Sequence, residues 1–193
     1  SEPGPNGEPG QGDLYGALQS LDYAAARGAK IINASWGGEN CSETLRQSIN
    51  RLGSLGILVV VASGNNGVDL ESRPDYPAIF NAPTQITVAA IRSNGYMSIF
   101  SNTSFKYVHI AAPGEAIYST VPTNSVGSMS GTSMAAPFVT GAAALLWSHR
   151  PTATALQIKQ AILSSTDAGS YRVETQGRLN IEKALQAIES LVQ

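Results

Sequence analysis

The sequence has 193 residues, enough for one domain with a sizeable hydrophobic core. Hydrophobic residues make up 42% of the chain, which is ordinary for a globular protein and excludes the disordered and fibrous classes. Charged residues reach only 13%, the formal net charge is −2, and no run of Lys or Arg occurs, so the charge pattern argues against nucleic acid or anionic lipid as partners.

The chain divides into a short leading segment and one domain. Residues 1–12 are polar and rich in Gly and Pro, and we interpret them as an exposed loop or processing segment. Residues 13–193 form the domain. No charged and then apolar leader opens the chain, so no targeting signal is expected in this sequence.

From residue 14 onward, helical and extended patterns alternate. The helices show apolar residues three and four positions apart, and the strands are short apolar runs between turn residues. In chain order they predict a helix over 14–27, a strand over 30–34, a helix after Ser42, strands over 57–62 and 85–91, weaker strands over 107–111 and 116–120, and helices over 133–149, 154–163 and 179–191. This order predicts an α/β domain around a mostly parallel sheet.

Two local features limit the chain further. The longest aliphatic run, residues 57–62, predicts a strand buried on both faces and is far shorter than the ~20 residues of a membrane span. The single cysteine, Cys41, excludes an internal disulfide and a multi-cysteine metal site. We expect it to be a structural thiol, a reactive thiol at a helix start, or the partner of a cysteine in another polypeptide.

The strongest candidate for chemistry is a Gly/Ser-rich turn, residues 127–132, that leads into the helix predicted from Ser133. Unpaired backbone N–H groups and the positive end of the helix dipole meet there. That place favours developing negative charge, which suits a serine that attacks a carbonyl carbon. The alternative is that Ser133 only caps the helix.

Two strand ends are weaker candidates. Asn65 lies in the loop after the buried strand 57–62, and residues 33–38 also run from a strand into a small-residue loop. Ligands bind beyond the carboxyl ends of strands in open α/β sheets. The alternative for both segments is an ordinary turn.

The chain offers Ser133 no adequate base. His149 lies sixteen residues along the same predicted helix, about 24 Å away along its axis. The sequence does not strictly exclude His109, which lies on the candidate strand over 107–111, but a positioned base also needs an orienting partner. A G-x-S-x-G elbow and a Ser-x-x-Lys pair both fail, because Ala135 and Ala136 occupy the positions that would need Gly and Lys.

Three segments together resemble one family. Residues 131–137, Gly-Thr-Ser-Met-Ala-Ala-Pro, resemble the nucleophile motif of the subtilisin-like serine proteases (subtilases, peptidase family S8). Residues 62–65 resemble the strand end that carries their oxyanion-hole asparagine, and residues 32–38 resemble their substrate-binding edge segment. Residues 76–78, 112–114 and 177–180 match in order and approximate spacing. The resemblance implies a three-layer α/β catalytic domain with a mostly parallel central sheet flanked by helices.

The resemblance also implies residue roles. Ser133 would form the acyl-enzyme, and the Asn65 side chain with the Ser133 backbone N–H would hold the oxyanion. Ser35, Trp36 and Gly37 would pair with the substrate backbone as an added strand. The pocket for the residue before the cut would be walled by Ala62, Ser63 and Gly64 and, opposite, by Asp75 and Tyr76, with Thr132 also in contact with substrate. The Asp75 carboxylate would favour Lys or Arg there; the alternative is a solvated loop aspartate.

The sequence departs from the family pattern in two ways. The family order is Asp, His, Ser, but this chain has no D-[ST]-G and no H-G-[TS] segment. It therefore resembles the C-terminal half of a subtilase catalytic domain, with the N-terminal half absent from this chain. Phe138 stands where relatives commonly have a histidine outside the triad, a change expected to alter packing only.

Three accounts follow. We favour a cleaved, two-chain enzyme whose separate N-terminal chain supplies the Asp and His, because a half-domain would expose a sheet edge and a cut core. An inert half-domain fragment is the second account, and a non-enzymatic module that binds anions at the 127–133 turn is the third. The expected partners are that N-terminal half, a protein or peptide substrate, and a propeptide or inhibitor. No cofactor or metal residue is expected here, calcium would lie in the missing half, and the sparse charge suits a secreted protein.

Overall fold

The computed structural model describes residues 12–122 and 124–192, so nearly all of the predicted leading loop, residues 1–12, lies outside it. A six-stranded sheet has the order β1-β2-β3-β4-β8-β7, and a separate hairpin pairs β5 with β6. In the six-stranded sheet, neighbouring strands are parallel except for the antiparallel pair β7–β8. The strands are β1 (Ile31–Ala34), β2 (Leu58–Ala62), β3 (Gln85–Ile91), β4 (Ile110–Pro113), β5 (Ile117–Val121), β6 (Ser125–Met129), β7 (Asp167–Ala168) and β8 (Gly177–Arg178).

Five helices lie in the described residues: α1 (Leu14–Ala26), α2 (Glu43–Ser54), α3 (Thr132–His149), α4 (Ala155–Ser164) and α5 (Ile181–Leu191). Four begin at side-chain caps that accept a backbone N–H, which satisfies donors that the first turn leaves free. These caps are Asp13, Ser42, Thr154 and Asn180. The exception is α3, whose N-cap is Gly131.

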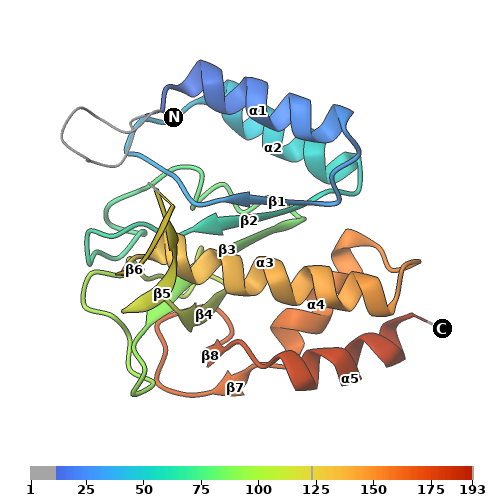
Figure 1. Ribbon diagram of the computed structural model, residues 1–193. Helices are drawn as coiled ribbons and strands as arrows, with labels where there is room; N and C mark the ends of the chain where they lie inside the picture. Colours follow the sequence, from blue (N-terminus) through green and yellow to red (C-terminus); the bar gives the residue numbers. More distant parts are fainter. Residues whose placement is uncertain (1–11, 123, 193) are drawn as a thin grey trace.

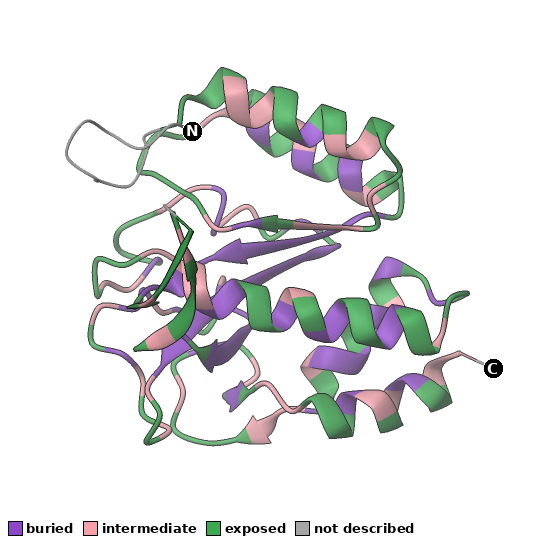
Figure 2. Cartoon of the chain, in the orientation of Figure 1, coloured by how far each residue is buried: buried purple, intermediate pink, exposed green. Residues whose placement is uncertain are grey.

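The core lies on both faces of the sheet, so the domain has three layers. One cluster packs α3, α4 and α5 against Leu58, Val60 and their neighbours in the sheet. The other packs α1 and α2 against Val59, Val61 and Ala89 on the opposite face. Every residue of β2 and β3 is buried, as the purple strands of Figure 2 show. The predicted fold class is confirmed.

The structure differs from the predicted elements where strands are short or polar. The prediction missed β6, which together with β5 forms a largely exposed hairpin, and β7 and β8, which have two residues each. Such strands carry too few apolar residues for a periodic pattern. The weaker strand predicted over 107–111 instead begins at Ile110.

The sheet has an open edge at β1 in the described residues. In the described residues β1 pairs with β2 alone, and Ile31, Ile32 and Asn33 are partly or fully exposed. An unpaired strand edge presents backbone donors and acceptors to whatever lies next to it. Figure 1 shows β1 as the end strand, below α1 and α2.

Across residues 12–122 and 124–192, no helix has the length and hydropathy to cross a membrane.

Candidate active site

Segments far apart in the sequence meet around one small cavity. Helix α3 packs across β1 to β4, which brings its first turn to the loops that follow β1 and β2. The cavity has a volume of about 190 Å³. It is lined by Trp36, Gly37, Ala62, Gly64, Asn65, Asn66, Asp75, Thr132 and Ser133. The tertiary structure thus gathers the three segments that the sequence singled out.

Ser133 is the second residue of α3, and Gly131 is its N-cap, so Ser133 does not cap the helix. The hydroxyl of Ser133 donates to the carbonyl of Ser35 over 3.1 Å. Pro137 lies four residues further on and has no N–H to donate to the Ser133 carbonyl. That carbonyl instead accepts a hydrogen bond of 2.9 Å from the Ser35 hydroxyl. Ser35 therefore fixes both polar ends of the candidate nucleophile.

The side chain of Asn65 is oriented by Thr132. Its Oδ1 accepts from the Thr132 backbone N–H (2.8 Å) and from the Thr132 hydroxyl (3.0 Å). The same hydroxyl accepts from the Gly64 N–H over 3.1 Å. With Oδ1 engaged twice, Nδ2 is the end of the amide left to donate to a ligand in the cavity. An amide donor and a helix N-terminus beside one serine are the parts of an oxyanion hole.

The other predicted substrate residues fall into two groups. Trp36, Gly37, Ala62, Gly64, Asp75 and Thr132 line the cavity, whereas Ser35 contacts it through Ser133. Ser63 and Tyr76 do not line it. Ser63 is fully buried and donates to the Asn102 carbonyl (2.9 Å), and the Tyr76 backbone pairs with Gly38. Asn66 lines the cavity and was not predicted; its only signal was its place beside Asn65.

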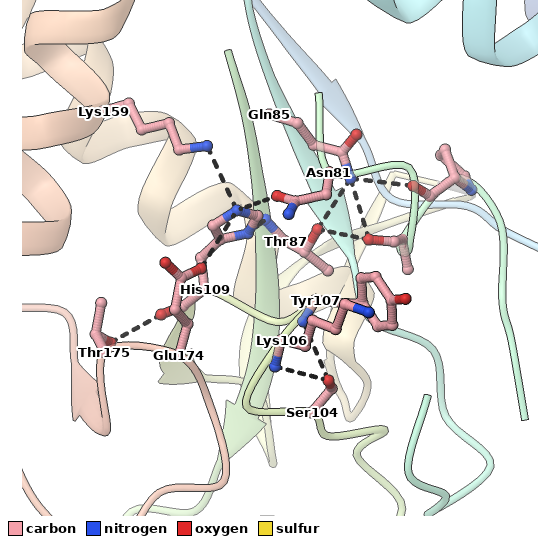
Figure 3. A network of polar contacts seen from close by, with 12 residues as sticks. Asn81, Gln85, Thr87, Ser104, Lys106, Tyr107, His109, Lys159, Glu174 and Thr175 are labelled. Atoms are coloured by element: carbon pink, nitrogen blue, oxygen red, sulfur yellow. Dashed lines mark hydrogen bonds and ion pairs between the residues drawn. The ribbon is translucent and has the colours of Figure 1, made fainter. Parts of the chain in front are cut away.

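Neither histidine serves Ser133. His149 is at the far end of α3, where it contacts Glu189. His109 is 1% exposed and belongs to the polar network drawn in Figure 3. Its partners Thr87, Asn81 and Lys159 are not among the residues that line the cavity. Its Nδ1 accepts from the Thr87 N–H (2.9 Å), so in the neutral ring Nε2 carries the proton and faces Asn81 Oδ1 at 3.1 Å. His109 is therefore a structural residue.

We expect His109 to make stability depend on pH. Burial, and then the nearby Lys159, lowers its pKa from 6.5 to about 3. In the unfolded chain His109 thus binds a proton below pH 6.5, whereas in the folded chain it binds one only below about pH 3. The free energy of unfolding should therefore decrease as the pH is lowered from 6.5 towards 3. This residue contributes a decrease of up to about 1.4 kcal/mol per pH unit.

Urea unfolding between pH 7 and pH 4 measures this slope. The matched variant is His109→Gln, since a glutamine can accept and donate in one side chain without titrating. Its slope should be smaller than that of the wild type. Equal slopes in the two proteins would contradict the expectation.

Residues 12–122 and 124–192 contain no group of three His, Cys, Asp or Glu side chains placed to hold a metal ion. Cys41 is exposed and unpaired with any other cysteine, because it is the only one in the chain.

A family model described as the Subtilase family matches residues 4–186. The chain is 36% identical over 179 residues to subtilisin DY of Bacillus licheniformis, covering 92% of this chain and 64% of that protein. It is 40% identical over 179 residues to thermitase of Thermoactinomyces vulgaris, covering 92% of this chain and 61% of the relative. Over 141 residues it is 43% identical to subtilisin-like protease 2 of Plasmodium falciparum, covering 71% of this chain and 10% of that protein.

Solved structures agree with the sequence matches. The fold superposes on the prenylagaramide maturation protease PagA with a TM-score of 0.82 and 28% identity, covering 94% of this chain and 69% of PagA. It superposes on the self-cleaved protease domain of PatA with a TM-score of 0.80 and 30% identity, covering 90% of this chain and 67% of that domain.

Proposed function

Since the chain belongs to the subtilase family of serine peptidases, we propose that it is the part of a serine endopeptidase that carries the nucleophile Ser133 and its oxyanion hole. The observation that carries this proposal is the double contact of Thr132 with Asn65 Oδ1, which orients the amide beside Ser133. Because the chain spans only 64% and 61% of subtilisin DY and thermitase, the activity of the whole protein is part of the proposal.

The reaction proceeds by acyl transfer. A histidine base takes the proton of Ser133 Oγ, and Oγ attacks the carbonyl carbon of the scissile bond. For this transfer, the Ser133 hydroxyl must first give up its hydrogen bond to the Ser35 carbonyl. The oxyanion receives hydrogen bonds from the Ser133 backbone N–H and Asn65 Nδ2. The histidine next protonates the leaving amine, and water hydrolyses the acyl-enzyme by the reverse proton path.

The base and its orienting aspartate come from a polypeptide segment outside these 193 residues. We place this segment against the outer edge of β1, whose end carries Ser35 into the site. A strand added there would pair the backbone groups of β1 and cover its half-exposed isoleucines. The self-cleaved domain of PatA supports the proposal that this segment is a separate N-terminal chain.

The substrate is an extended protein or peptide chain that lies along the exposed residues Trp36 and Gly37 as a further strand. A propeptide or an inhibitor would bind along the same segment. We further propose that the protease is secreted and that any calcium binds in the segment that supplies the base.

Labelling with a fluorophosphonate, which modifies only activated serines, tests the proposal. The chain is treated alone and after co-expression with the segment of its own gene that carries the Asp and His motifs. We expect one adduct, on Ser133, only in the assembled protein, because only there is a base present. Intact mass and peptide mapping locate it.

Two variants control the labelling. Ser133→Ala should lose the adduct, whereas Ser130→Ala, whose hydroxyl accepts from the Ala116 N–H, should keep it. An assembled protein without any adduct would support the inert fragment, or the anion-binding module, over the peptidase.

A further inference from the structure

Asp75 places a carboxylate in the cavity beside Ser133 and Asn65. Its Oδ1 is fully buried and has no hydrogen-bond partner in the described residues. This corrects the alternative of a solvated loop aspartate. A charged carboxylate is costly in such a place, because burial removes water from Oδ1 without supplying that oxygen with a partner.

Two glycines make room for this carboxylate. A Cβ on Gly37 would lie 2.5 Å from Asp75 Oδ1, and a Cβ on Gly64 would lie 3.1 Å from Oδ2. Real Cβ atoms essentially never approach as closely as 2.5 Å, so a larger residue at position 37 would displace the carboxylate, and one at position 64 would crowd it. Gly37 and Gly64 also line the cavity, which puts Asp75 between its walls.

The backbone around Asp75 is fixed. Tyr76 and Gly38 exchange two backbone hydrogen bonds of 2.9 and 2.8 Å. The buried Gln85 side chain donates to the carbonyls of Pro77 and Ala78 over 3.0 and 3.1 Å, part of the network in Figure 3. These bonds anchor the backbone that follows Asp75, and Asp75 lines the cavity.

The surrounding charges leave Asp75 without a counter-ion. Burial raises its pKa, and Glu39 acts in the same direction, while the Gly38 backbone and Arg73 oppose them. The Arg73 guanidinium is paired with Glu39 and forms no ion pair with Asp75. Within the described residues, no cation therefore neutralises the carboxylate, and a ligand that brings one would gain the missing interaction.

On the basis of the serine peptidase function above, we propose that Asp75 selects Lys or Arg as the residue before the scissile bond. The cavity of about 190 Å³ is smaller than the ~300–1,000 Å³ of small-molecule pockets and suits one side chain. Asp75 shares it with Ser133, so a side chain that reaches the carboxylate belongs to the residue being acylated. An ammonium or guanidinium there forms a charge-assisted hydrogen bond with the buried oxygen.

A binding experiment tests the cavity without requiring activity. Benzamidine, an aryl amidinium, and benzamide, its uncharged analogue, are titrated into the protein while the two tryptophan indole signals are followed by NMR. Trp36 lines the cavity, whereas Trp147 is buried in the core and serves as an internal reference. Benzamidine should shift the Trp36 signal alone, and benzamide should bind at least about 10-fold more weakly.

Two variants complete the binding test. Asp75→Asn should abolish the difference between the two compounds. Glu39→Gln changes a nearby exposed carboxylate and should preserve that difference. Equal binding of benzamidine and benzamide to the wild type would overturn the proposal.

Cleavage tests the specificity itself. Peptides that differ only in Arg, Lys, Leu or Phe before the cut are compared by kcat/KM with the assembled protease. We expect a preference for Arg or Lys over Leu of about 100-fold, reduced to about 10-fold or less in Asp75→Asn. Each preference is a ratio of kcat/KM values measured with the same protein, so a loss of folded enzyme does not change it.

The outcomes separate the two proposals. Cleavage after Leu as fast as after Arg would refute the role of Asp75 and leave the peptidase function standing. No cleavage of any peptide would refute the peptidase function, and the benzamidine titration would still decide whether the cavity selects a cation.

Discussion

Replacing Ser133 with alanine is expected to lower kcat for peptide hydrolysis by the assembled protease about 10⁶-fold, the magnitude measured when the nucleophile of subtilisin is removed. The reason is that the neighbouring hydroxyls of Thr132 and Ser35 are already engaged in hydrogen bonds. Thr132 is engaged with Asn65 and Gly64, and Ser35 with the Ser133 carbonyl. KM should change little, because the residues that line the cavity remain.

Hydrolysis of a peptide with a chromogenic leaving group, with active sites counted by titration, measures this loss. Ser130→Ala is the matched control, since it removes a hydroxyl from the same turn without touching the cavity. Residual activity within about 100-fold of wild type would show that another residue forms the acyl-enzyme.

Replacing Asn65 with alanine is expected to lower kcat about 10²–10³-fold, a magnitude taken from the matching asparagine of subtilisin. The amide Nδ2 donates to an oxygen that bears full charge only near the transition state, so kcat should fall and KM should stay within a few-fold. Thr132 already aligns this amide through two contacts with Oδ1.

Two variants separate the contribution of the Asn65 amide donor from that of Thr132, which orients it. Asn65→Asp keeps the shape but replaces the donor with a carboxylate, and it should be at least as damaging as Asn65→Ala. Thr132→Val keeps the backbone donor to Oδ1 and removes only the hydroxyl, so its loss of kcat should be smaller. If Asn65→Ala raised KM and spared kcat, Asn65 would be a substrate-binding residue and no part of an oxyanion hole.

Much of the framework was predictable because it depends on local pattern. The all-apolar run of β2 predicts burial on both faces, and that is what the sheet between two helical layers gives it. The caps Ser42 and Thr154 and the long small-residue helix α3 mark their elements by residue type. Strand β5 matches the weaker strand predicted over 116–120, whereas β6 escaped prediction because its largely exposed residues carry no apolar alternation.

The sequence by itself determined the fold class and the motif around Ser133, since helix and strand periodicity and residue type at a turn are properties of neighbours in the chain. Only the tertiary structure decided which of those residues meet. Contacts between Ser133 and Ser35 join positions 98 residues apart, and those between Thr132 and Asn65 join positions 67 apart. The same packing buried Ser63 in the core and left Asp75 Oδ1 without a hydrogen-bond partner among the described residues. The burial and hydrogen bonding of a side chain depend on which segments the sheet and α3 bring together. The spacing of neighbouring residues in the sequence does not predict those long-range contacts.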